Sequence, residues 1–142
     1  MGKASVLLGR VRGIPIRVDA SWIVIFVLAT WSMARGILPA LHPGWPPALT
    51  FAVAATTATL FFFSVLWHEV AHSLVALANG LQVREITLFV FGGASQMDDE
   101  PERPRTEFIV ALAGPVASLV LGGLWLLVAL AARAPELEGV QV

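Results

Sequence analysis

Residues 61–80 have the sequence FFFSVLWHEVAHSLVALANG, an apolar run that carries three ionisable side chains and closes on an asparagine and a glycine. The apolar sequence extends upstream to residue 43, and Pro46 and Pro47 suit the start of a helix. Asn79-Gly80 is a typical helix stop. Because a helix needs about 20 apolar residues to cross a bilayer core, we predict a transmembrane helix over residues 47–79.

The ionisable residues of this helix form the pattern His68-Glu69-Val70-Ala71-His72. His68 and His72 are four residues apart and share one helix face, where two imidazoles can bind one Zn²⁺ ion. Glu69 lies about 100° around the helix, from where it can act as general base on a water at the metal. The alternative is that these are polar residues at a span end, close to water. Ionisable residues within a span are costly and usually functional, which favours a site for one zinc ion.

The composition is that of a membrane protein. Hydrophobic residues make up 57% of the 142 residues and charged residues 13%, whereas soluble domains have about 25% charged residues. Further apolar stretches predict spans over about 20–38 and 106–132, although the first could instead be a cleaved signal peptide. The predicted fold class is an all-α membrane protein with about three transmembrane helices and a small β element on the cytoplasmic side.

Charge and cysteine content exclude several partners. The net charge of −1 gives no basic face for nucleic acid, so the predicted environment is the lipid bilayer. The chain has no cysteine, so any metal must be held by imidazole or carboxylate. The sequence gives no indication of the oligomeric state.

Positive charges differ between the two sides of the predicted spans. Seven cationic residues lie before the first span or between the second and third spans, and two lie elsewhere. The seven are Lys3, Arg10, Arg12, Arg17, Arg84, Arg103 and Arg105, and the two are Arg35 and Arg133. The positive-inside rule therefore predicts a multi-pass protein of the cell membrane, with the N-terminus and the 80–105 loop in the cytoplasm.

Two segments outside the spans have strand character. Residues 81–97 are rich in β-branched and aromatic residues and contain Gly92-Gly93, which predicts strands with a tight bend. Residues 5–19 are interpreted as an N-terminal hairpin, and residues 98–105 as a charged loop, with a flap at the site entrance as the alternative. In the third span, the spacing of Gly114 and Ser118 favours close packing against the helix of residues 47–79, with a direct role in the chemistry as the alternative.

Several short motifs occur in an order that is typical of one family. They are HEVAH at residues 68–72, FGG at 91–93 and AGP at 113–115, preceded by GRVRGIPIRVDASW at 9–22. Together they resemble the site-2 protease family of intramembrane metalloproteases, in its bacterial and archaeal branch, over essentially the whole chain. The resemblance implies that His68 and His72 are zinc ligands and that Glu69 is the catalytic glutamate.

The implied activity is hydrolysis of peptide bonds in membrane-anchored protein substrates. In the resembling family, the segment after the HExxH helix forms a sheet or re-entrant element near the zinc. We therefore hypothesise that the strand of residues 86–91 presents an open edge to which an unwound substrate segment adds as a further strand. The candidate substrate-binding residues are Leu88, Val90, Gly92 and Gly93.

A catalytic zinc site normally has three protein ligands, and the sequence offers two. The family's third ligand is an aspartate on a later span, in a motif that this sequence lacks. We expect residues 1–142 to be a single peptidase core segment of a longer zinc endopeptidase, with the remaining spans absent. The alternative is a catalytically incomplete membrane protein that binds zinc or a partner.

Overall fold

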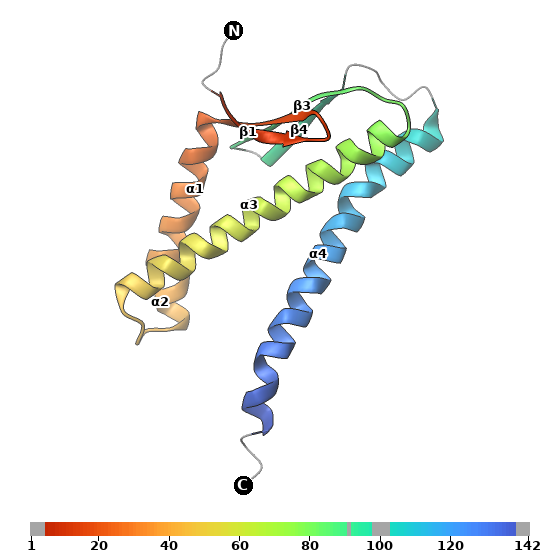
Figure 1. Ribbon diagram of the computed structural model, residues 1–142. Coiled ribbons are helices and arrows are strands. Elements are labelled where there is room, and N and C mark those ends of the chain that lie inside the picture. Colours follow the sequence, from red (N-terminus) through yellow and green to blue (C-terminus); the bar gives the residue numbers. More distant parts are fainter. Residues whose placement is uncertain (1–4, 91, 98–102, 139–142) are drawn as a thin grey trace.

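The computed structural model describes residues 5–90, 92–97 and 103–138 (Figure 1). In chain order, its elements are β1 (Ser5–Val11), β2 (Ile14–Asp19), α1 (Ala20–Ser32), the π-helical turn η1 (Met33–Ile37), α2 (Leu38–Leu41), α3 (Pro47–Ala78), β3 (Val83–Phe89), β4 (Gly92–Met97) and α4 (Pro104–Glu138). Most of the charged loop predicted for residues 98–105, including its four acidic side chains, lies outside the described residues.

Three helical segments within the described residues are long and apolar enough to cross a membrane: Ala20–Leu41, Pro47–Ala78 and Pro104–Ala132. The sequence predicts 20–38, 47–79 and 106–132 for the same three. At about 1.5 Å per residue, the 32 residues of α3 extend over about 48 Å, well beyond a bilayer core of about 30 Å. The predicted fold class, three membrane-length helices with a small sheet, is confirmed.

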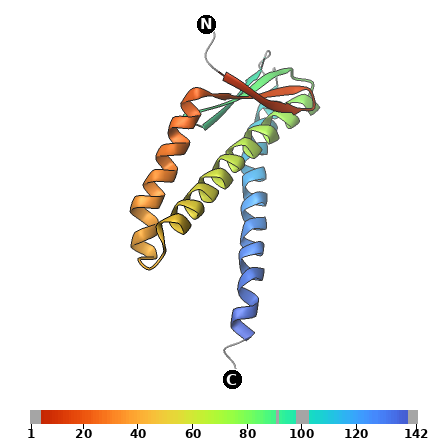
Figure 2. The same cartoon turned by 60° about the vertical axis from the view of Figure 1, so that its left-hand side comes forward.

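The long helix α3 runs obliquely between the other two spans (Figures 1 and 2). Near its start it packs against the first span, where Ala34, Leu38 and Ala54 form a buried apolar cluster. The C-terminal end of α3 lies beside the first half of α4, and α4 then runs away from α3 towards the end of the chain. The close approach of α3 and α4 therefore occurs next to the sheet.

The strands form one four-stranded sheet in the order β1-β2-β3-β4. β1 and β2 are an antiparallel hairpin whose turn residues Arg12 and Gly13 both have positive φ, 48° and 88°, as a tight two-residue hairpin turn requires. β3 and β4 are also antiparallel, whereas β2 and β3 run parallel. The two β segments that the sequence predicts separately are thus joined into a single sheet.

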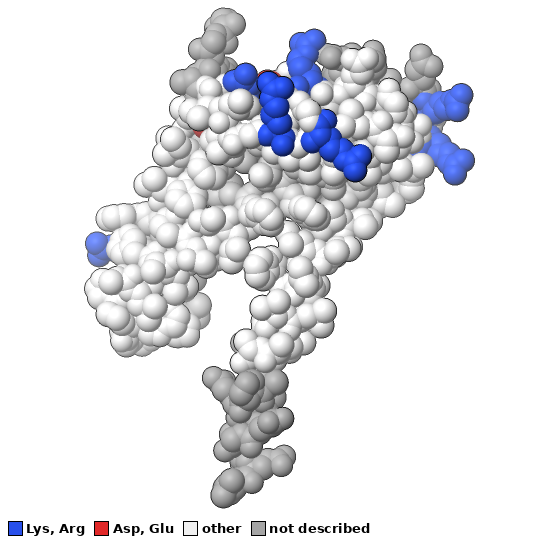
Figure 3. Space-filling view, viewed as in Figure 1, with Lys and Arg blue, Asp and Glu red and all other residues white. Residues whose placement is uncertain are grey.

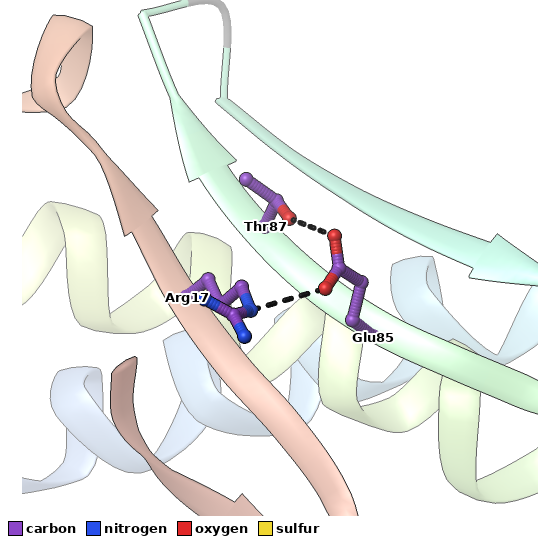
Figure 4. A network of polar contacts seen from close by, with 3 residues as sticks. All are labelled: Arg17, Glu85 and Thr87. Carbon is purple, nitrogen blue, oxygen red and sulfur yellow. Dashed lines mark hydrogen bonds and ion pairs between the residues drawn. The ribbon is translucent and has the colours of Figure 1, made fainter. Parts of the chain in front are cut away.

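The junction between β2 and β3 carries polar contacts on the outer face of the sheet (Figure 4). Arg17 Nε lies 3.1 Å from a carboxylate oxygen of Glu85, and Oγ1 of Thr87 donates to the other oxygen at 3.3 Å. Both charged side chains are partly exposed, so this ion pair contributes little to stability, about 1 kcal/mol or less. The sheet must be fixed mainly from its other face.

That inner face packs on the end of α3. Ile14, Ile16 and Ile86 form a buried cluster with Val70 of α3. Complete burial of one such side chain stabilises the fold by about 1.5–3 kcal/mol, and Ile86 is fully buried. Since Val70 lies between Glu69 and His72, this cluster holds the sheet directly beside the three ionisable residues.

The hypothesis of an open edge at residues 86–91 is wrong. β3 is an interior strand, paired with β2 on one side and β4 on the other, and the edge strands of the sheet are β1 and β4. β2 pairs there because it brings Ile16 into register with Ile86 in the apolar cluster. The glycine pair is also not the bend, because Gly92 and Gly93 open β4 and the turn begins at Val90.

Candidate metal centre

The two histidines of α3 face each other across one helical turn. The Nε2 atoms of His68 and His72 are 3.0 Å apart, and the two rings meet edge to face. Two nitrogen ligands of one tetrahedral zinc ion, each about 2.0–2.1 Å from the metal, lie about 3.3 Å apart. The observed spacing is close to that value, so the pair can supply two adjacent corners of one metal site.

The other ring nitrogen of each histidine is held by α4. Nδ1 of His72 lies 2.7 Å from the carbonyl oxygen of Val110, and Nδ1 of His68 lies 2.9 Å from Oγ of Ser118. Because a carbonyl only accepts, Nδ1 of His72 donates its proton, and a neutral ring then has its free lone pair on Nε2. The Ser118 hydroxyl can accept from His68 in the same way. Such contacts fix the tautomer and the ring orientation of metal-binding histidines.

Two glycines make room for the ionisable side chains. A Cβ atom at Gly114 of α4 would overlap Nε2 of both His68 and His72. A Cβ atom at Gly93 of β4 would overlap Cγ of Glu69 and come within 3.2 Å of its carboxyl carbon. The AGP and FGG motifs therefore each supply a position where the backbone itself forms a wall of the site.

The carboxylate of Glu69 is bound from the sheet. Its Oε2 atom accepts a hydrogen bond of 2.9 Å from Oγ of Ser95, a β4 residue, and Ser95 accepts one of 3.1 Å from Ser73. An open pocket of about 330 Å³ lies over the carboxylate and the first histidine. It is lined by Ser64, Val65, His68, Glu69, Gly92, Gly93 and Ser118.

The predicted substrate-binding residues divide into two pairs. Gly92 and Gly93 line the pocket, beside His68 and Glu69. Leu88 is buried under the sheet, and the backbone N–H of Val90 donates to Oγ of Ser21 in α1 at 3.3 Å. Neither Leu88 nor Val90 lines the pocket.

Within the described ranges, no three His, Cys, Asp or Glu side chains come together as a metal site would require. The part of the chain that the structure describes thus brings together two metal donors, His68 and His72, and Glu69 borders the same pocket as His68. The remaining histidine, His42, stacks on Trp45 in the connection between α2 and α3, with ring centroids 4.1 Å apart.

Sequence reasoning missed three partners of the site. Val110 acts through its carbonyl oxygen, which every residue has, so the residue type carries no signal. For Ser118, the Gly-xxx-Ser spacing favours helix packing, because that spacing is typical of close helix contacts. For Ser95, the sequence predicts no more than a place in a strand. Its position two residues after Gly93, which puts both residues on one face of a strand, is the signal that could have indicated a site residue.

Comparison with known proteins identifies relatives that are all named as peptidases. The sequence model described as peptidase family M50 matches residues 56–137. A Synechocystis sp. protein is 43% identical over 119 residues, which are 82% of this chain and 30% of the relative. A Mycobacterium tuberculosis protein is 39% identical over 114 residues, 80% of this chain and 29% of the relative. The names of both describe them as putative zinc metalloproteases.

A solved structure also matches. The site-2 protease from Methanocaldococcus jannaschii superposes with a TM-score of 0.62 at 29% sequence identity, over 87% of this chain and 50% of that chain. The present chain thus spans about 30% of the length of the curated relatives and half of the solved chain.

Replacing Gly114 with alanine tests the close approach of α4 to the histidines. The added methyl group displaces both imidazoles, so Gly114→Ala should lose most of the metal that the wild-type protein retains on purification. The matched control is Gly122→Ala on the same helix, where a Cβ atom meets nothing within 4 Å. Metal content per chain, measured by elemental mass spectrometry, decides the matter. Equal metal in both variants would contradict the proposed crowding.

Proposed function

The chain belongs to peptidase family M50, and we propose that it carries the HExxH part of an intramembrane zinc endopeptidase that cleaves membrane-anchored proteins. The observation that carries the proposal is the set of His68, Glu69 and His72 in a membrane-length helix, with both Nε2 atoms converging. The names of the relatives and the likeness to a solved site-2 protease support it.

His68 and His72 would hold one Zn²⁺ ion through Nε2, because their Nδ1 atoms are engaged by α4 and the Nε2 spacing suits one ion. A third protein ligand would come from outside the described residues, within which two donors converge. When bound, zinc supplies Lewis-acid chemistry that activates water and polarises the scissile carbonyl.

Glu69 would move the protons of the reaction. Its carboxylate borders the same pocket as His68, so it can accept a proton from the attacking water and return it to the leaving amine. Gly93 brings the backbone of β4 against the Glu69 side chain, leaving no room for a side chain at that position. The carboxylate therefore faces the pocket with one wall made of backbone.

The substrate would enter along β4. A transmembrane helix shields its own peptide bonds, so it must unwind before cleavage, and an extended segment can then add to a sheet edge. β4 is an edge strand, and its first residues, Gly92 and Gly93, line the pocket. Leu88 contributes by packing beneath Gly93, and Val90 by holding the turn against α1.

The sheet end of the molecule would face the cytoplasm. Cationic side chains gather around the sheet and the start of α4, whereas η1, which carries Arg35, lies at the other end (Figure 3). The positive-inside rule assigns the cation-rich end to the cytoplasm.

Replacing Glu69 with glutamine tests the catalytic role. Glu69→Gln preserves the shape and removes the basicity, so cleavage of a membrane-anchored reporter should fall by about 10²–10⁴-fold while zinc content stays near wild type. The double variant His68→Ala, His72→Ala should lose both cleavage and zinc. If Glu69→Gln cleaves as well as wild type, the activity does not arise from this site. A protein that contains the third ligand and binds zinc, yet cleaves nothing in any variant, is a membrane zinc-binding protein instead.

A photo-crosslinking amino acid distinguishes the two sheet edges. Introduced at Gln96, which is exposed on β4, it should capture the substrate in a Glu69→Gln background. Introduced at Val6, which is exposed on β1, it should not. Capture from Val6 but not from Gln96 would mean that the substrate binds at the β1 edge instead.

The lack of cysteine in the chain makes its orientation directly measurable. In intact cells, a membrane-impermeant maleimide should label Gly44→Cys, which lies between α2 and α3, and not Arg10→Cys on β1. Both positions are exposed, so both should react after the membrane is permeabilised. The reverse labelling pattern would invert the proposed topology.

A further inference from the structure

Two hydroxyl groups connect the buried Ser73 of α3 to Glu69 of the same helix by way of β4. Ser73 donates to Ser95 at 3.1 Å, and Ser95 donates to Oε2 of Glu69 at 2.9 Å. We infer that Ser95 is a positioning residue that sets the carboxylate of Glu69 for proton transfer. The inference rests on the proposed function, since it assigns a role within that same site.

The behaviour of Ser73 is the first support. In the interior of a helix, serine and threonine usually donate to a carbonyl of their own preceding turn. Thr57, Thr59 and Ser64 of α3 do so, at 2.6–2.8 Å. Ser73 is fully buried, yet its hydroxyl donates across to Ser95. A buried hydroxyl needs a partner, and this one is satisfied by β4.

The direction of the two hydrogen bonds is the second support. Because Ser73 donates to Ser95, the single proton of the Ser95 hydroxyl is directed at Glu69. Hydrogen bonds in such a chain polarise one another, and one that ends on a carboxylate is stronger than a neutral pair. Ser73 and Glu69 are one turn apart on α3, so Ser95 bridges both and fixes β4 against the helix.

Close packing on the same carboxylate is the third support. Gly93 lies two residues before Ser95 on β4 and touches the Glu69 side chain, leaving no room for a Cβ atom. A free glutamate has several rotatable bonds, and ordering it costs entropy. Because Gly93 and Ser95 of β4 restrain Glu69, its side chain loses this conformational entropy when the protein folds and not when the substrate binds. The carboxylate is then preorganised towards the pocket.

One residue consequently links the substrate strand to the catalytic group. In the proposed function, a substrate segment pairs with the outer edge of β4, while Ser95 of the same strand is bound to Glu69. A displacement of β4 therefore changes the position of the carboxylate. Loss of the Ser95 hydroxyl should affect turnover rather than substrate affinity, because the substrate is bound by the backbone of the strand.

A double-mutant cycle tests the contact without any need for activity. In the intact protein in lipid nanodiscs, Ser95→Ala should lower the thermal unfolding midpoint by several degrees. In the Glu69→Ala background, the same substitution should lower it clearly less, because the partner is already gone. Equal decreases in the two backgrounds would mean that Ser95 serves only the fold, through Ser73, and would overturn the inference.

Kinetics on the same proteins test the role. Ser95→Ala should lower kcat about tenfold or more, with KM and zinc content unchanged, and Ser95→Thr, which keeps a hydroxyl, should recover most of the rate. The control is Thr87→Val, which removes a hydroxyl that contacts Glu85 on the outer face of the sheet. This variant should leave kcat unchanged. An unchanged kcat in Ser95→Ala would overturn the inference.

The two tests separate this inference from the proposed function. If the wild-type protein cleaves nothing, the proposed function fails. The unfolding cycle still decides whether Ser95 holds Glu69. If the wild-type protein is active and Glu69→Gln is not, the function stands, and the Ser95 variants alone decide the positioning role.

Discussion

The arrangement around the end of α3 depends on one constraint, which is that polar side chains in an apolar helix must find partners within the protein. Lipid offers no hydrogen bonds, so an unpaired polar group there costs several kcal/mol. The two histidines are satisfied by α4, through Val110 and Ser118. Glu69 is satisfied by Ser95 of β4. The need for these partners explains why α4 and the sheet meet at this point of α3.

Apolar packing holds the sheet in the position that the polar contacts of Glu69 require. Val70 lies between the ionisable residues in sequence and packs into the cluster of Ile14, Ile16 and Ile86. That cluster also explains the parallel pairing of β2 with β3, which joins the N-terminal hairpin to the segment after α3. The hairpin is remote from Glu69 in sequence, yet by supporting β3 it supports β4, which carries Ser95.

Local patterns in the sequence were enough to predict the spans and the set of ionisable residues. A run of apolar residues longer than a bilayer is thick specifies a helix with little dependence on its neighbours, and HExxH spacing determines which side chains share a face. The strand pairing was not predictable in this way, because nothing in residues 86–91 tells an interior strand from an edge strand. That difference depends on Ile16 pairing with Ile86, a contact between distant parts of the chain. The same holds for Val110, whose carbonyl is chosen by the position of α4 alone.

The close approach at Gly114 links helix packing to the properties of the metal site. With its Nδ1 proton donated to Val110, His72 turns a lone pair towards Nε2 of His68, 3.0 Å away. If both Nε2 atoms are unprotonated, their lone pairs repel, and a cation held between them removes that repulsion. Because Val110 and Ser118 of α4 hold the same two imidazoles, part of the binding energy of a metal would stabilise the contact between α3 and α4, as metal sites commonly couple to folding. A side chain at Gly114 would displace both imidazoles. The absence of a side chain at this position therefore gives the two imidazoles the room that the metal site needs.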